Sequence, residues 1–501
     1  MMKESDSQGL TQKGSGKDGK GRVAITQYLA ALAGPTNIPP SPPPQTPRMT
    51  PPELQLNIQR LTAGMGAFTV GTVLSWSSSA LPMLQNSTTT PLERPMNDDE
   101  GMWIGSLLAI GALIGAFPAG YLADRIGRKY LQLGLALPFI VSWIIIVFAK
   151  QVVALFVARL LAGIATGGIC VVAPLYIGEI AETSIRGNLG SYFQLLLTVG
   201  ILFSYMLGAL LDYTWLGIVS GVAPVVFLVA LFFAPETPFY LVARNKRNLA
   251  EISLVWLRGK TRNVSDELDR IEEEVDEARR NKGTFRDLIS SRANRNALVI
   301  SLGLMIFQQF CGINAVIFYA AEIFRIAGSD LDPNICAIIV GAFQVVFTYG
   351  AALLVDRAGR KILLLISSGV MIACLFTLGI YFQLTASDEE LVKSIGWIPL
   401  IALNVFIACF SLGFGPLPWM MMGELFSTTI KEMACAMAVT MNWMLVFVVT
   451  KTFKDLILAL GTAGTFWLFG SISCLGFLFI CFVVKETKGK TFAEIQRMIG
   501  G

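Results

Sequence analysis

The sequence contains no histidine, and Asp, Glu, Lys and Arg together make up only 15% of its 501 residues. So little charge, beside 54% hydrophobic residues, excludes a soluble enzyme of this length. The missing histidine removes the side chain that most often carries protons near neutral pH. The eight cysteines form no paired extracellular pattern, so we expect free packing thiols. We expect no enzyme activity, cofactor or metal site.

Long apolar runs dominate what is present. A membrane-spanning helix needs about 20 such residues, and their Leu, Ile, Val and Phe content favours helices over the shorter alternating strands of a barrel. We therefore predict an all-α membrane protein with twelve transmembrane helices in two six-helix halves. The runs are roughly 62–84, 102–123, 130–149, 152–175, 188–211, 215–234, 297–323, 334–355, 362–384, 396–421, 433–452 and 464–484.

The segments between the runs predict the domain organisation. Residues 1–22 are polar and Lys-rich, so no cleavable signal peptide is expected, and the proline-dense stretch 35–52 predicts an extended tether. The polar linker carries charges at helical spacing and is too short for a catalytic domain. The predicted parts are a disordered cytoplasmic tail 1–57, an N-terminal bundle 58–237, a cytoplasmic helical linker 238–296, a C-terminal bundle 297–484 and a cytoplasmic tail 485–501.

The distribution of Lys and Arg predicts the orientation in the membrane. They concentrate in both tails and in the 240–296 segment, whereas the first outer loop is acidic at 98–100, which predicts cytoplasmic termini and a multi-pass protein of the plasma membrane. Asn86 then starts an outer glycosylation sequon, while the sequon at Asn263 lies on the cytoplasmic side. The net charge of +4 suits anionic lipid, and nothing indicates nucleic acid.

Three short motifs occur twice, in the same order. The first is Asp-Arg-x-Gly-Arg-Lys, the second is Gly-Glu followed by a basic residue, and the third is Glu-Thr. Their order indicates an internal duplication. The copies lie at 124–129 and 356–361, at 178–186 and 423–431, and at 236–237 and 486–487.

We predict that the charged residues of these motifs form two ionic latches at the cytoplasmic helix ends. Alternating access requires such latches to form in one state and break in the other. Simple topogenic charge is the alternative, but it explains only the basic residues. The first latch comprises Asp124, Arg125, Arg128, Glu179, Arg186 and Glu236, and the second Asp356, Arg357, Arg360, Glu424, Lys431 and Glu486.

Polar side chains at mid-membrane depth are costly, and they predict a substrate site. Neutral amides donate and accept hydrogen bonds without charge, which suits a polyhydroxyl ligand, although a lone membrane Gln often serves only as an interhelical contact. A continuous helix would place Asn314 about 120° from Gln308, so either the lined face is wide or the helix loosens near Gly312. The candidates are Gln194, Gln308, Gln309, Asn314, Gln344, Trp419 and Asn442.

The tenth run contains Gly415, Pro416 and Pro418, whose missing N–H groups predict a kink. A gate and a purely structural kink both fit this pattern. The first run has no Asp or Glu, and Arg159 is the clearest charge inside a span, so passive transport is the simpler mechanism.

These motifs, with 235–238, 308–314 and 415–419, resemble the sugar porter family of the major facilitator superfamily over roughly residues 58–497. The stretches 301–319, 411–424 and 448–453 are most similar to insect facilitative trehalose transporters. The resemblance implies sugar contacts at Gln194, Gln308, Gln309, Asn314, Trp419 and Asn442. Departures from the glucose-carrier pattern concern the sugar more than the mechanism. They are Ser411 for Glu, Gln344 for Asn, Val446 for a second Asn, Lys431 for Arg and Lys485 for Pro.

The sequence therefore predicts a facilitative uniporter for trehalose or a hexose, in which a monomer suffices for transport. The alternatives are a proton-coupled sugar symporter, a sugar sensor without transport, which the long N-terminal tail suggests, and a drug exporter, for which a greasy or acidic pocket is expected.

Overall fold

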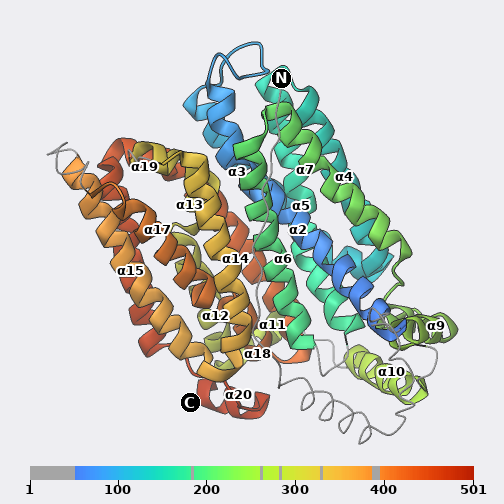
Figure 1. Cartoon of the computed structure of the whole chain (residues 1–501). Helices are drawn as coiled ribbons and strands as arrows, with labels where there is room; N and C mark the ends of the chain where they lie inside the picture. The colour runs from blue at the N-terminus through green and yellow to red at the C-terminus, as the bar shows by residue number, and fades with distance from the viewer. Residues whose placement is uncertain are drawn as a thin grey trace, which may run out of the picture. The chain divides into compact units, whose positions relative to one another are not determined.

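A computed structural model describes residues 51–181, 186–259, 263–280, 285–327, 331–385 and 395–500. The described part is helical and contains no strand, and residues 51–501 form one compact unit (Figure 1). Residues 51–57, predicted as the end of the disordered tail, are helical, and the rest of that tail lies outside the described residues. The all-α membrane fold is confirmed.

Long helices make up both halves. In the N-terminal half they are α2 (Pro51–Gln85), α3 (Asp98–Ile126), α4 (Arg128–Phe148), α5 (Val152–Ile180), α6 (Arg186–Leu210) and α7 (Tyr213–Phe233). In the C-terminal half they are α12 (Arg292–Phe310), α13 (Ile313–Ile326), α14 (Pro333–Ala358), α15 (Arg360–Thr385), α17 (Ile398–Cys409), the π-helical turn η1 (Phe410–Phe414), α18 (Leu417–Leu425) and α19 (Thr428–Phe482).

Twelve spans follow from these helices. Within the described residues, 10 helical segments are long and apolar enough to cross a membrane. One of them, Met433–Phe482, is interrupted at Gly461, where φ is 73°, so it counts as two. The Ser- and Thr-rich α2 is the remaining span. Short helices α8 (Pro238–Ala243), α9 (Arg247–Arg258), α10 (Ser265–Arg280) and α11 (Phe285–Ser290) form the linker, and α20 (Phe492–Gly500) follows the last span.

The two ends of the bundle have different chemistry. Helix α3 has 29 residues, about 43 Å at 1.5 Å per residue, and runs from the loop that holds Asn86 to the first Asp-Arg-x-Gly-Arg-Lys motif. We call these the sequon end and the motif end. At the motif end, Gly127 and Gly359 have φ of 109° and 92°, which only glycine adopts readily, and each turns the chain directly into the next helix.

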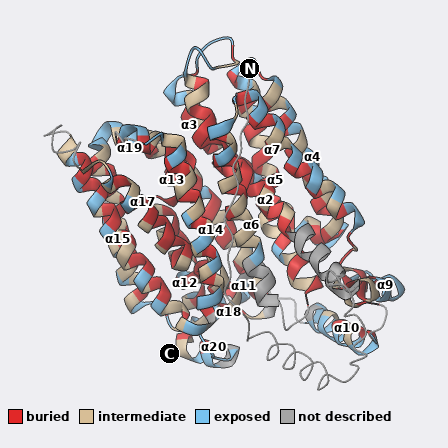
Figure 2. Ribbon diagram, in the orientation of Figure 1, coloured by how far each residue is buried: buried red, intermediate tan, exposed pale blue. Residues whose placement is uncertain are grey.

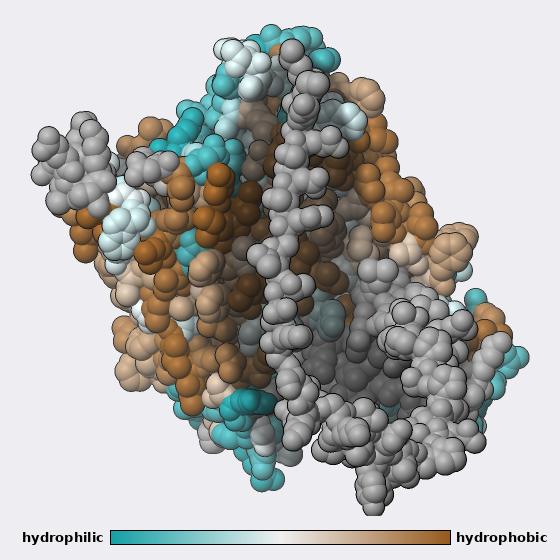
Figure 3. Space-filling model, in the orientation of Figure 1, coloured by the Kyte–Doolittle hydropathy of each residue, from teal (hydrophilic) through white to brown (hydrophobic). Residues whose placement is uncertain are grey.

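Packing within and between the halves uses close helix pairs. A Cβ atom on Gly167 would lie 1.9 Å from the carbonyl oxygen of Ala112, so glycine lets α5 approach α3. Between the halves, α3 packs on α19, α6 on α14 and α2 on α13. Buried residues follow the long helices in Figure 2. Hydrophobic side chains cover much of the described surface seen in Figure 3. Phe117, Phe148 and Phe232 are among the exposed large hydrophobic residues.

Candidate functional site: two motif clusters, an inter-half cluster and a buried amide group

The first motif cluster centres on Glu179 at the motif end of α5. Its Oε1 lies 3.0 Å from Nη2 of Arg128, and its Oε2 accepts a 2.6 Å hydrogen bond from the Thr237 hydroxyl. Arg128 also binds Asp124 at 2.9 Å and the carbonyl of Ala123 at 3.2 Å. The cluster therefore ties α3, α4 and α5 to the start of α8.

Glu236 joins this cluster because its side-chain carboxylate binds backbone N–H groups of neighbouring residues. Its carboxylate accepts hydrogen bonds from the N–H groups of Arg128 and Lys129, each at 3.1 Å, and from that of Thr237 at 2.9 Å. The first two N–H groups begin α4 and have no partner inside that helix. Glu236 thus places a negative charge at the positive end of the α4 dipole.

The C-terminal half repeats the glutamate contacts of this arrangement. Glu424 Oε1 lies 3.0 Å from Arg360, and its Oε2 accepts a 2.5 Å hydrogen bond from Thr487. Glu486 accepts from the N–H groups of Arg360 and Lys361 at 2.9 and 3.0 Å, at the start of α15. The duplication seen in the sequence is therefore also a duplication of three-dimensional contacts.

Other predicted latch residues stand apart from these clusters. The guanidinium of Arg125 lies over the ring of Tyr121, and the Arg357 carbonyl accepts from Lys488. No ion pair joins Arg125, Arg357 or Lys431 to a carboxylate in the described part of the chain. The side chains of Arg186 and Asp356 lie outside the described residues. The Arg128–Glu179 and Arg360–Glu424 pairs each stay within one half.

Ion pairs between the halves lie at the sequon end. Lys454 on α19 binds Asp98 on α3 at 2.9 Å and Glu322 on α13 at 3.2 Å. Lys451 binds Asp99 at 2.8 Å and lies 4.8 Å from the centre of the Trp103 ring. We call these residues the inter-half cluster. Glu322 also lies 3.5 Å from Arg325. The sequence indicates the acidic loop of this cluster, but neither lysine.

Gln308 and Asn442 form the centre of a buried amide group. Gln308 Nε2 donates to the carbonyls of Phe414 and Gly415 at 2.7 and 3.0 Å. Its Oε1 accepts from Asn442 Nδ2 at 3.1 Å, and both residues are less than 5% exposed. This group links α12, α19 and the interrupted tenth span.

Gln309 and Asn314 make a second amide pair through Oε1 and Nδ2. The span loosens between them, because α12 ends and Gly312, with φ of 84°, starts α13. Of the two alternatives that the sequence leaves open, the structure has the helix break. That break brings the side chain of Asn314 back to Gln309, on the preceding helix.

The remaining predicted contacts are dispersed. Gln344 on α14 is 3% exposed, and its Oε1 has no hydrogen-bond partner among the described residues. Gln194 on α6 and Trp419 on α18 are partly buried, and no side-chain hydrogen bond is described for either. Trp443 on α19, a second tryptophan that the sequence places among these polar spans, is buried, and its Nε1–H is likewise without a described partner. Such an orphan polar group is visible only in three dimensions.

Arg159 is a fully buried cation in the N-terminal half. It donates to the carbonyls of Ile104 and Val73 at 3.0 and 2.9 Å and lies 5.3 Å from the Trp76 ring. No ion pair to a carboxylate is recorded for it within the described ranges. The charge is therefore held by backbone dipoles and an aromatic face.

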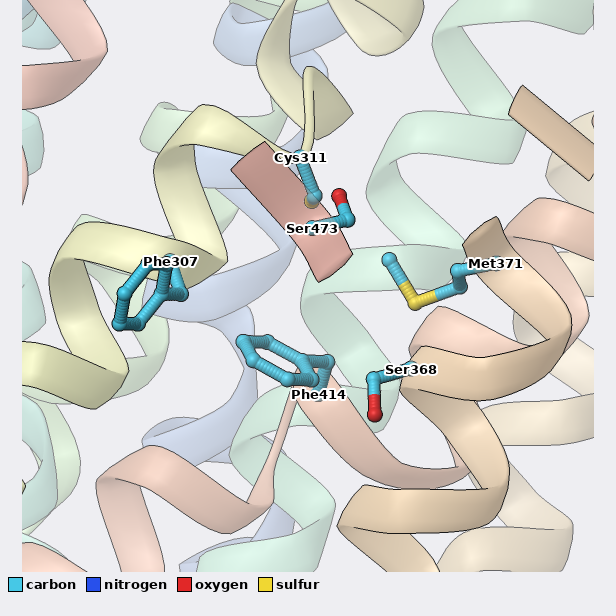
Figure 4. A pocket seen from close by; sticks show the side chains of 6 residues that line it. All are labelled: Phe307, Cys311, Ser368, Met371, Phe414 and Ser473. Atoms are coloured by element: carbon cyan, nitrogen blue, oxygen red, sulfur yellow. The ribbon is translucent and has the colours of Figure 1, made fainter. Parts of the chain in front are cut away.

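A small pocket lies beside the amide group but does not include it. It is lined by Phe307, Cys311, Ser368, Met371, Phe414 and Ser473, as Figure 4 shows. Its cavity volume of about 10 Å³ corresponds to at most one water molecule. It is therefore a packing gap within the C-terminal half and not a sugar site.

The family model described as "Sugar (and other) transporter" matches residues 61–499. The "Facilitated trehalose transporter Tret1" of Culex quinquefasciatus is 40% identical over 88% of this chain and 85% of its own length. That of Aedes aegypti is 41% identical over 88% of this chain, and the chain spans only 54% of that relative.

Solved structures are similar over most of the chain. The proton:xylose symporter XylE, bound to 6-bromo-6-deoxy-D-glucose, has a TM-score of 0.72 and 26% identity over 89% of this chain and 99% of its own. An inward open conformation of the E. coli xylose transporter XylE has the same TM-score with 25% identity.

Proposed function

Since the chain belongs to the family of sugar (and other) transporters, we propose that it is a facilitative transporter that carries trehalose or a hexose by alternating access. The observation that carries the proposal is a set of two amide pairs beside two broken helices: the buried pair Gln308–Asn442 and the partly buried pair Gln309–Asn314. Uncharged donors and acceptors at that depth match the hydroxyls of a neutral sugar. Gln194, Gln344 and Trp419 complete the proposed site.

Uniport is favoured over proton coupling by the charges in the spans. Residues 64–85 of α2 contain no Asp or Glu, and the chain has no histidine. The buried Arg159 is bound by carbonyl groups. The relatives named facilitated trehalose transporters are also more similar in sequence, at about 40%, than the proton symporter at 26%.

The proposed orientation puts the motif end in the cytoplasm and the sequon end outside, at the plasma membrane. The inter-half cluster then closes the outer side, while the motif-cluster ion pairs stay inside each half. This supports an inward-facing state in which the N-terminal bundle (58–237) and the C-terminal bundle (297–484) separate at the cytoplasmic side. A turnover requires the inter-half cluster to break.

Uptake into proteoliposomes tests the proposal. We expect trehalose or a hexose to equilibrate without accumulating, at the same rate with and without an imposed pH gradient. Competition among trehalose, glucose, fructose and sucrose identifies the substrate. Accumulation above equilibrium that is driven by protons would instead indicate a symporter, and binding without flux would indicate a sensor.

A further inference from the structure

The tenth span is broken at a place where two of its carbonyl groups have no described backbone donor. In a continuous helix, the N–H of residue 418 would donate to the carbonyl of Phe414, but Pro418 has no N–H. Gly415 N bonds the carbonyl of Phe410 at 2.7 Å, and the next bond beyond the break runs from Met420 N to Pro416 O at 3.1 Å. The carbonyls of Phe414 and Gly415 fall between these two bonds.

Gln308 fills this gap from another helix. Its Nε2 donates to both carbonyls, and its Oε1 is occupied by Asn442. A side-chain amide has two N–H donors, so both donors of Gln308 are committed to the backbone of the tenth span. A sugar oxygen that accepts from Gln308 must therefore displace a carbonyl, and an unpaired buried carbonyl is unfavourable.

We propose that Gln308 is a positioning residue as well as a sugar contact, and that a sugar and the Phe414 and Gly415 carbonyls compete for its amide. This rests on the proposed function. Sugar binding then takes the Gln308 donors away from these two carbonyls. The carbonyls must find other donors, either because the tenth span rearranges or because a sugar hydroxyl donates to them. Occupancy of the site is thereby coupled to the conformation of η1 and α18.

We call the donation from Gln308 to the Phe414 and Gly415 carbonyls the cap. It is tested first, by the melting temperature of the protein in detergent without sugar. Gln308→Met removes the donors and keeps the size, and should lower the melting temperature by about 2–5 °C. Gln309→Met is the matched control, because Gln309 pairs with the Asn314 side chain and caps no described carbonyl. Gln309→Met should lower the melting temperature clearly less than Gln308→Met. Equal losses for the two variants would overturn the cap.

A double-mutant cycle then locates the bond. Pro418→Ala supplies an N–H for the Phe414 carbonyl. In that background, Gln308→Met should therefore lower the melting temperature less than it does in the wild-type protein. Pro416→Ala is the matched background, because its new N–H would face the carbonyl of Leu412, and there the full loss should remain. Equal losses in all backgrounds would overturn the cap. If Pro418→Ala does not fold, the comparison of Gln308→Met with Gln309→Met decides.

The competition is tested by equilibrium binding of trehalose and of glucose. Pro418→Ala should tighten the binding of the transported sugar by about three- to tenfold, because Gln308 is released from Phe414. Unchanged affinity with an intact cap would overturn the competition. If the wild-type protein binds neither sugar, the competition and the proposed function fail together, while the melting cycle still decides the cap.

Discussion

Lys454 Nζ lies 2.9 Å from Asp98 Oδ1, although the two residues are 356 positions apart. The contact joins α19 to α3 and hence one half of the molecule to the other. Glu322 shares the same ammonium group at 3.2 Å, and Gln85 donates to Asp98 at 2.9 Å. Lys454 and Glu322 are each only about one-eighth exposed, so this is a partly shielded network and not an isolated surface pair.

Reversal of this charge should shift the transporter toward the outward-open state. Lys454→Glu would place a third negative charge beside Asp98 and Glu322, so we expect the population of the outward-open state to rise by roughly fivefold, which corresponds to about 1 kcal/mol. The measurement is the labelling rate of a single cysteine placed in the outer vestibule. The double variant Lys454→Glu/Asp98→Lys should restore the wild-type rate. A rate that Lys454→Glu leaves unchanged would contradict a gating role.

Loss of the carboxylate charge of Glu424 or Glu179 should destabilise the half of the molecule that contains it. Glu424→Gln weakens the contact with Arg360, and we expect a loss of about 1.5–3 kcal/mol, seen as a lower melting temperature in detergent. Glu179→Gln should behave similarly, since Glu179 makes the same two contacts. Lys431→Ala serves as the control and should change little. A loss for Lys431→Ala as large as for Glu424→Gln would speak against the described pairing.

The Glu486 contacts should be insensitive to pH until strongly acidic conditions. Burial raises the pKa of this carboxyl, but the N–H groups that donate to it outweigh burial and lower the pKa below its ordinary 4.5. Its stabilising effect is therefore complete above about pH 4.5 and is lost as the pH falls through the folded-state pKa. Glu486→Gln should lower the melting temperature by a constant amount between pH 7 and about pH 5.5, and by less below pH 4.5. A difference that grows on acidification would be inconsistent with this assignment.

Glycan attachment tests the proposed orientation. Asn86 is exposed, and its Oδ1 accepts from the N–H and hydroxyl of Thr88, so the sequon is accessible. We expect glycosidase treatment to shift the protein on a gel, and Asn86→Gln to abolish the shift. Asn263→Gln should leave it intact. If the shift requires Asn263 instead, the motif end faces outward.

Sequence reasoning works where chemistry is local or repeated. The runs of apolar residues specify the spans, and the duplicated motifs already point to the acids and bases that meet as Arg128–Glu179 and Arg360–Glu424. Gly312 marks the helix break because a residue without Cβ tolerates a positive φ.

Other contacts depend on tertiary packing that no local pattern encodes. Lys454 and Asp98 belong to no repeated motif, and only the packing of α19 on α3 brings them together. The sequence predicts that Glu236 pairs with a charged side chain. In the structure its oxygens accept from backbone N–H groups instead, and the sequence does not show which of these two partners a carboxylate has. The same holds for Gln308, because the carbonyl of Phe414 loses its helical donor at Pro418, 110 residues away.

Glu236 closes the motif end of its half from 108 residues downstream of Arg128, and Glu486 does the same for Arg360 over 126 residues. The first residues of α4 and α15 therefore wait, during synthesis on the ribosome, for a carboxylate that is made only when each half is nearly complete. The last few residues of each half thus complete the contacts at the start of its third helix, and a chain truncated before either glutamate leaves that helix start uncapped.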